Sequence, residues 1–202
     1  MKLRSFHGRV CAAVVCVGLA ACSTPLAPRY HTLLSTPAQA RDAVPAFDAA
    51  WELLPVSMPV QVEQPQLVVR ADDGTMALLE GERWVAPLNE EMRAALGDRL
   101  SRALGGDGRR GMAATRSGWR IRVDVKRFDS MPGRAIRLDA HWALLPGDEA
   151  LRPLRCQTLI EQPVPAGYPA LSAAHRAAAI QLADAIAATL RRVAAEPGAG
   201  CP

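Results

Sequence analysis

The sequence predicts an α+β domain in which two amphipathic helices pack on one face of a largely antiparallel sheet, an α/β sandwich. Three observations indicate this class. Segments 119–125 and 136–144 alternate apolar and polar residues with the period of two that half-buried strands show. Segments 87–104 and 170–194 repeat apolar residues with the period of a helix. Most of the strands are expected to be joined by hairpin connections.

The N-terminus precedes this domain and has the pattern of a leader. Three basic residues stand before an apolar run that starts at Val10 and closes on Leu19-Ala20-Ala21-Cys22. This order is typical of a secretory signal peptide, and the run is shorter than the ~20 residues of a membrane-spanning helix. Small residues directly before a cysteine resemble the bacterial lipobox. We therefore expect residues 1–21 to be a lipoprotein signal peptide and Cys22 to be the lipid attachment site. An ordinary signal peptide with a chance cysteine is the alternative.

The expected lipid anchor also predicts a location. Two or more acyl chains hold a protein stably on a membrane, whereas one holds it marginally. Ser23 follows the cysteine, where an Asp would resemble a signal for retention in the inner membrane. We therefore expect the periplasmic face of the outer membrane. Residues 22–29 are expected to be the lipidated N-terminus and an extended tether, because Pro25 and Pro28 disfavour helix.

Length and charge limit what the mature chain does. Removing 21 of the 202 residues leaves 181, enough for one domain with a proper core. The formal net charge of +4 becomes +1 without the leader's three basic residues, so the charge does not point to nucleic acid as a partner. The basic residues removed are Lys2, Arg4 and Arg9.

The five cysteines divide by their position. Cys11 and Cys16 are expected to be removed with the signal peptide, and Cys22 is expected to carry lipid. Cys156 and Cys201 remain in an oxidising compartment, where a disulfide between them is possible. Two separate thiols are the alternative, because sequence does not show whether their geometry permits bonding.

The domain is expected to span residues 30–195 and to begin with short strands. Tyr30-His31-Thr32-Leu33-Leu34 is rich in β-forming residues, and a loop follows to residue 50. The apolar segment 51–62 contains Pro55 and Pro59. Since proline removes a ladder donor, we expect an edge strand or an irregular one there.

A hairpin and the first helix come next. Asp73-Gly74 between the apolar segments 67–70 and 76–79 is typical of a β-hairpin. The helix is expected over about 87–104, with Pro87 at its first position, where the missing N–H is not needed. One apolar stripe is expected to consist of Leu88, Met92, Leu96, Leu100 and Leu104.

The clearest strand pair follows, with its loop at Met131-Pro132-Gly133. A further strand is expected over about 154–161, then an alanine-rich helix over 170–194 and an irregular tail over 196–202. The apolar stripe of that helix is expected to be Leu171, Leu182, Ile186, Leu190 and Val193.

The sequence contains no motif of catalysis, metal binding or cofactor binding, and we expect no enzyme activity. His141 beside Asp139 is an acid–base pair or a solvated strand face, and His175 beside Arg176 is expected to be a surface pair. The tryptophans are core residues or interface anchors, with Trp84 expected to pack the helix entry onto the sheet. They are Trp51, Trp84, Trp119 and Trp142.

One strand face of the predicted hairpin is basic. It is a solvated face, or it meets acidic lipid headgroups or an acidic partner. Its cations are Arg120, Arg122, Lys126 and Arg137.

The order of several short motifs resembles a known family. They are Tyr30-His31-Thr32-Leu33, Pro65-Gln66-Leu67-Val68-Val69-Arg70, Arg83-Trp84-Val85-Ala86-Pro87-Leu88, Val123-Asp124-Val125-Lys126-Arg127-Phe128 and Leu138-Asp139-Ala140-His141-Trp142. With the lipobox ahead of them, they resemble the ABC-type transport auxiliary lipoproteins, a family that includes the paraquat-inducible lipoproteins.

The resemblance implies a function as well as a fold. It implies an α/β-sandwich domain hung from the outer membrane beside a lipid-transport system, whose periplasmic component carries mammalian-cell-entry (MCE) domains. It implies a docking piece that receives the far end of a periplasmic tube, in a possible homo-oligomeric ring and without a cofactor. A structural or envelope-assembly lipoprotein with no transport role is the alternative.

Overall fold

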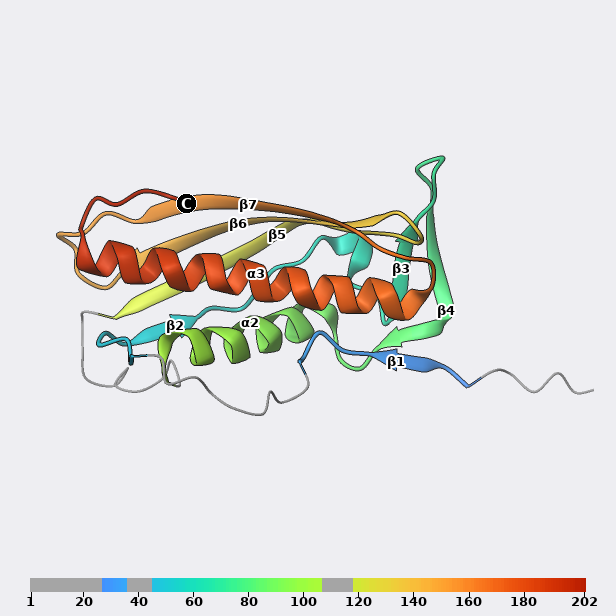
Figure 1. The fold of residues 1–202 in the computed structure, drawn as a ribbon, viewed down its shortest axis with the longest axis horizontal. Helices are drawn as coiled ribbons and strands as arrows, with labels where there is room; N and C mark the ends of the chain where they lie inside the picture. The colour runs from blue at the N-terminus through green and yellow to red at the C-terminus, as the bar shows by residue number, and fades with distance from the viewer. Residues whose placement is uncertain (1–26, 36–44, 107–117) are drawn as a thin grey trace, which may run out of the picture.

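A computed structural model describes residues 27–35, 45–106 and 118–202 of the chain. Within these ranges lie a three-stranded sheet, a four-stranded sheet and two α-helices, and the predicted α+β class is confirmed (Figure 1). The expected signal peptide, Cys22 and the tether as far as Leu26 lie outside the described residues. The elements are β1 Arg29–His31, β2 Trp51–Leu53, the 3₁₀ turn η1 Val60–Val62, β3 Gln66–Arg70, β4 Met76–Trp84, α2 Leu88–Leu104, β5 Trp119–Met131, β6 Ala135–Pro146, β7 Leu154–Pro163 and α3 Tyr168–Ala195.

The larger sheet has the strand order β2-β5-β6-β7 and shows the alternation that the sequence predicts. β5, β6 and β7 are antiparallel neighbours, whereas β2 pairs in parallel with β5. Lys126 is an extra residue between Val125 and Arg127, a β-bulge, so two consecutive side chains are exposed before Phe128 resumes the buried face. The buried face of β6 consists of Ile136, Leu138, Ala140, Trp142 and Leu144.

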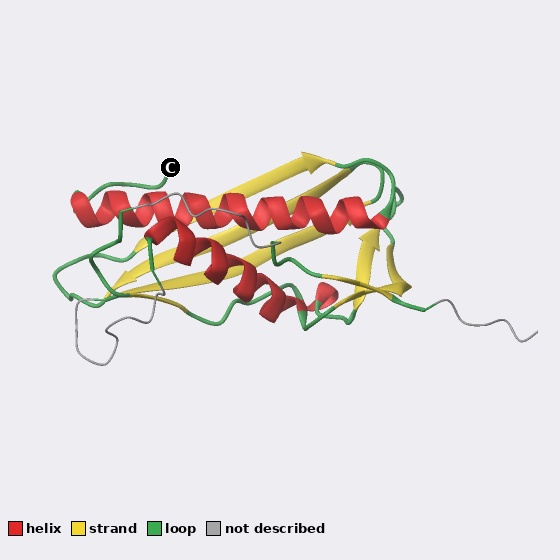
Figure 2. Cartoon of the chain, turned by 60° about the horizontal axis from the view of Figure 1, so that its bottom comes forward, coloured by secondary structure: helices red, strands yellow, loops and turns green. Residues whose placement is uncertain are grey.

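Both helices lie on one face of the larger sheet, as predicted (Figure 2). α2 begins at Leu88, and Pro87 is the capping residue before it rather than its first residue. α3 begins at Tyr168, slightly earlier than predicted. The predicted apolar stripes are confirmed: α2 buries Leu88, Met92, Leu96, Leu100 and Leu104, and α3 buries Leu171, Leu182, Ile186, Leu190 and Val193.

The smaller sheet, in the order β1-β4-β3, stands at the end of the molecule where the N-terminal chain leaves (Figure 1). β3 and β4 form the predicted hairpin, and Gly74 in its turn has a φ of 86°, which glycine adopts without a Cβ penalty. β4 continues past the predicted end to Trp84, and β1 pairs in parallel with this extension. The strands thus form two sheets rather than one, because alternation determines which face of a strand is buried and not which strand it pairs with.

The proline-containing segment 51–62 forms the irregular edge that the sequence predicts. Only its first three residues are the strand β2. Beyond them, Leu54 donates a backbone hydrogen bond to Ile121 at 2.9 Å, and Ser57 accepts one from Val125 at 2.9 Å. These isolated bonds keep the segment beside β5 until it ends in η1.

Candidate functional site

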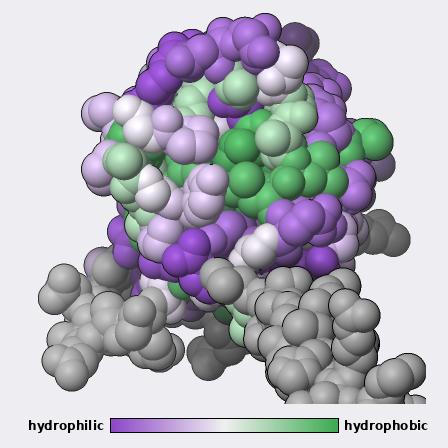
Figure 3. All heavy atoms as spheres, turned by 90° about the vertical axis from the view of Figure 1, so that its right-hand side faces the viewer, coloured by the Kyte–Doolittle hydropathy of each residue, from purple (hydrophilic) through white to green (hydrophobic). Residues whose placement is uncertain are grey.

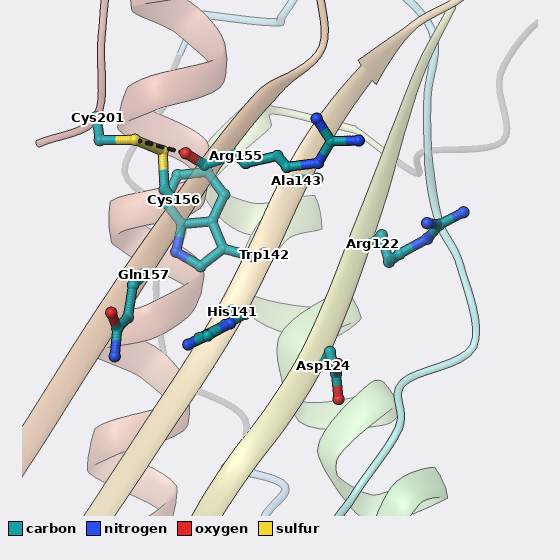
Figure 4. A pocket seen from close by; sticks show the side chains of 9 residues that line it. All are labelled: Arg122, Asp124, His141, Trp142, Ala143, Arg155, Cys156, Gln157 and Cys201. Carbon is teal, nitrogen blue, oxygen red and sulfur yellow. Dashed lines mark hydrogen bonds between the residues drawn. A yellow bond between two sulfur atoms is a disulfide. The ribbon is translucent and has the colours of Figure 1, made fainter.

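The face of the larger sheet that the helices leave uncovered carries the candidate site. Two rows of side chains cross β5, β6 and β7 on this face, and the members of each row are direct partners across the ladders. Successive side chains of a strand point to opposite faces, which separates these rows from the residues that face the helices. The rows are Arg122–Ala143–Arg155 and Asp124–His141–Gln157 (Figure 4).

A shallow depression of about 390 Å³ lies over the two rows. Its floor is Ala143, a short side chain that is buried between two arginines. Figure 4 shows Arg155 extending from β7 across Ala143 toward β5, whereas Arg122 turns away from it. The Arg155 guanidinium therefore lies over the floor of the depression, whereas the exposed Arg122 guanidinium lies at its edge on β5.

The acidic residue of the depression is engaged by the protein itself. Lys126 and the Ser57 hydroxyl donate hydrogen bonds to Asp124, the second at 2.8 Å. These bonds, with that from Lys126 foremost, hold the pKa of Asp124 below its ordinary value despite partial desolvation. Asp124 is therefore ionised at neutral pH, and Lys126 offsets its charge.

The predicted basic strand face divides into two halves. Toward the β5–β6 turn, Lys126 pairs with Asp124, and Arg137 pairs with Glu161 at 2.7 Å. Toward the other end, three cations form no ion pair with any carboxylate in the described part of the chain. They are Arg120, Arg122 and Arg155.

The C-terminal tail closes one side of the depression. Cys156 of β7 and Cys201 are joined by a disulfide in the structure. Arg192 of α3 donates a hydrogen bond to the carbonyl oxygen of Gly200 at 2.9 Å, so the tail is fixed at two points. The sulfur of Cys201 also lies 3.1 Å from the carbonyl oxygen of Arg155, which is a contact only, because a disulfide sulfur has no proton to donate.

His175 is buried, so the prediction of a surface pair with Arg176 is wrong. Its ring stacks on Phe128 with 3.8 Å between centroids and 12° between planes, and its Nε2 lies 2.8 Å from the Ser130 hydroxyl. Burial lowers the pKa of His175 to about 3, so the ring is neutral. The signal was present in the sequence, because His175 lies four residues after Leu171 on the apolar stripe of α3.

His31 lies in a buried polar cluster that sequence reasoning missed. Its Nε2 lies 2.6 Å from a Glu82 oxygen and its Nδ1 lies 3.1 Å from the Ser172 hydroxyl, which donates to the Pro169 carbonyl at 3.0 Å. Burial alone would raise the pKa of Glu82, but hydrogen bonds from His31 and Arg29 lower it overall. These residues are far apart in the chain, and no local pattern connects them.

This serine–histidine–glutamate set is structural rather than nucleophilic. A nucleophilic serine must give its proton to the histidine. The Pro169 carbonyl, 3.0 Å from the Ser172 hydroxyl, competes with His31 for that one proton. Ser172 is also buried in the first turns of α3, away from the open sheet face. The cluster fixes β1 to β4 and α3.

The tryptophans are core residues, not exposed anchors, because all four are at most 6% exposed. Trp84 lies between the two histidine clusters, with centroids 6.4 Å from His31 and 6.1 Å from Phe128. It thus packs the smaller sheet against β5 just before α2 begins.

An acid–base pair of His141 and Asp139 does not form in the described residues. Asp139, the expected acid partner of His141, accepts a hydrogen bond from Gln157 at 2.9 Å instead. No group of three or more potential metal ligands occurs in the described part of the chain. No helix within the ranges that the structure describes has the length and apolar character needed to cross a membrane.

Comparison with known proteins gives one family and several related folds. The family model of the ABC-type transport auxiliary lipoprotein component matches residues 31–187. An uncharacterised protein of known structure superposes with a TM-score of 0.66 at 17% identity, covering 81% of this chain and 99% of that one. A Xanthomonas campestris protein of the DUF330 family gives a TM-score of 0.59 at 20% identity, covering 83% and 96%. Both likenesses concern the fold alone, and no curated protein matches the chain.

Proposed function

This chain belongs to the family of ABC-type transport auxiliary lipoprotein components, and from that membership we propose that it is a non-catalytic docking component of a lipid-transport system. The system would link the inner and outer membranes, and its periplasmic component would carry MCE domains. The match over residues 31–187 is the observation that carries this proposal, because it covers nearly all of the described domain.

The position of β1 supports an anchored role. Arg29, the first residue of β1, follows the proposed lipid site Cys22 by seven residues. Seven extended residues span about 25 Å at most, so an anchor at Cys22 would hold β1 close to the membrane. Tyr30 of β1 and Val85, directly after β4, are exposed at 61% and 62%, and the end of the molecule at the smaller sheet has an apolar patch (Figure 3). Aromatic side chains with basic neighbours such as Arg29 suit a membrane interface.

The same geometry leaves the open sheet face available to a partner. Arg70 of β3 binds Asp129 of β5 at 2.8 Å, which marks the end of β5 next to the smaller sheet. Arg122 precedes Asp129 by seven residues, so it lies about 23 Å along β5 from the end next to the smaller sheet. The anchor would restrict the domain to the membrane surface and raise its effective concentration there, and a ring of copies would multiply weak contacts with a tube.

In-cell crosslinking of a C-terminally tagged copy, followed by mass spectrometry, tests the proposal. We expect an MCE-domain protein together with self-crosslinked multimers of this chain. Recovery of only assembly-machine or cell-wall proteins at good yield would instead support a structural or envelope-assembly lipoprotein.

The anchor has its own test in the variant Cys22→Ala. We expect this variant to accumulate as a soluble or an uncleaved product. A variant that is processed normally and remains in the outer membrane would refute lipidation at Cys22 without bearing on the partner.

A further inference from the structure

The uncovered face of the larger sheet has an excess of positive charge at one end. Arg120, Arg122 and Arg155 are exposed there without ion pairs in the described part of the chain. Glu52 of β2 is the direct ladder partner of Arg120 and counters its charge, and Asp124 is offset by Lys126, so the excess lies at Arg122 and Arg155. Guanidinium groups bind carboxylates through paired hydrogen bonds, which a lysine at the same position does not match. The chemistry of this end therefore favours an anionic group.

The shape of the site distinguishes a macromolecular ligand from a small one. Sites for small molecules enclose most of the ligand surface, whereas this depression lies open on the face of a sheet. A small free anion would contact only one side of the depression and Ala143 at its floor. An extended peptide on this face gains contacts beyond the arginines.

A second contact of a different kind lies on the same face. Leu159 of β7 is 60% exposed and is the direct partner of Asp139, the outward residue that follows the row of His141 and Gln157. It lies four residues from Arg155, about 13 Å along the strand. The face thus combines exposed arginines with an exposed apolar side chain, at a distance that a short extended peptide spans.

We infer that the row Arg122–Ala143–Arg155 is a docking seat for an acidic peptide segment of a partner protein, with Leu159 contacting an apolar residue of that segment. The inference rests on the proposed docking function and adds the chemistry of the partner. The tail held by the Cys156–Cys201 disulfide forms one rim of the seat.

The test uses the full lipoprotein in detergent micelles, labelled with ¹⁵N, and a synthetic octapeptide with two glutamates and a leucine four residues further on. We expect saturable amide shifts confined to residues 120–124, 141–143 and 155–159. The variant R122Q/R155Q should weaken binding at least tenfold, and higher salt should weaken binding to the native protein. The control Arg134→Gln removes the same type of charge at the β5–β6 turn and should bind as the native protein does.

Three results would overturn the inference. They are no binding of the octapeptide, equal binding of a peptide with glutamine in place of glutamate, and shifts that inorganic phosphate or glycerol 3-phosphate reproduces at the same affinity. The last result would assign the seat to a small phosphate anion or a lipid headgroup. The crosslinking experiment is independent, so an MCE-domain partner that is recovered while the octapeptide fails leaves the proposed function in place.

Discussion

The imidazole of His175 is a base that the fold keeps neutral. In the unfolded chain its pKa returns to 6.5, whereas in the folded protein burial lowers the pKa to about 3. Between these values the unfolded state binds a proton that the folded state does not, so stability is complete above pH 6.5 and is lost as the pH falls. The slope is about 1.4 kcal/mol per pH unit for one proton.

This predicts a specific pH dependence. Urea denaturation of the native protein at pH 7.5, 6 and 5 should show a decline in the free energy of unfolding. The variant His175→Gln keeps a hydrogen-bonding group for Ser130 but does not titrate, so its decline should be shallower. Equal slopes for the two proteins would contradict the assignment of the acid sensitivity to His175.

Glu82 is the residue whose charge holds β1 in place. Its carboxylate accepts hydrogen bonds from both His31 and Arg29, and its side chain is only 5% exposed. Because Glu82→Gln replaces the hydrogen bonds of a buried carboxylate by weaker neutral ones, it should cost about 2 kcal/mol of stability.

Hydrogen exchange provides the local readout for Glu82→Gln, with faster exchange expected for the amides of β1 and of Val85, which donates to the His31 carbonyl. The matched control is Glu161→Gln, which breaks a half-exposed pair with Arg137 and should cost less than about 1 kcal/mol. A control that is as destabilising as Glu82→Gln would mean that burial of the Glu82 carboxylate is not the cause.

At the scale of the elements, the disulfide determines where the tail after α3 lies. The bond between Cys156 and Cys201 closes a loop with a sequence separation of 45. The chain-entropy relation assigns about 4 kcal/mol to a loop of that size, so the double variant C156S/C201S should lose up to that amount. Denaturation of the native protein with and without reductant should reproduce the loss. No change under full reduction would show that α3 and β7 hold the tail without the bond.

The elements also show which part of the fold the sequence predicts. Local periodicity was sufficient for β5, β6 and both helices, because burial on one face leaves a repeating pattern such as Leu88, Met92 and Leu96. The parallel pairings of β1 and β2 leave no such pattern, since their partners are distant and each strand has three residues. For the same reason the His31–Glu82–Ser172 cluster was not predictable.

The candidate site was predictable in part. Alternation placed Arg120 and Arg122 on the polar face of β5, and this position is confirmed. The third arginine, Arg155, joins them only through the register of β6 with β7, which the sequence does not determine. Alternation also places Lys126 beside Asp124, two residues away on the same face, whereas the outward position of Arg127 depends on the β-bulge.

At the scale of the whole molecule, the described residues share a single buried core. The two sheets and both helices contribute to one cluster, which contains Trp84 of the smaller sheet and three tryptophans of the larger one, Trp51, Trp119 and Trp142. We therefore expect the sheets to unfold together, as small domains with one core do.

Tryptophan fluorescence and far-UV circular dichroism test this expectation, since their denaturation curves should coincide. The variant Trp84→Phe removes the probe at the junction with the smaller sheet and should leave the two curves coincident. An earlier fluorescence transition that disappears in Trp84→Phe would show that the smaller sheet opens first.

The location of β1 has a consequence for how the protein is made. β1 pairs with residues 82–84, and its His31 bonds Ser172, a sequence separation of 141. A chain that is synthesised and exported from its N-terminus presents β1 before any of these partners exists. Contacts of such separation in sequence form slowly. The strand next to the proposed anchor is therefore among the last to dock, and a lipid attached to Cys22 during export would join a domain that has not finished folding.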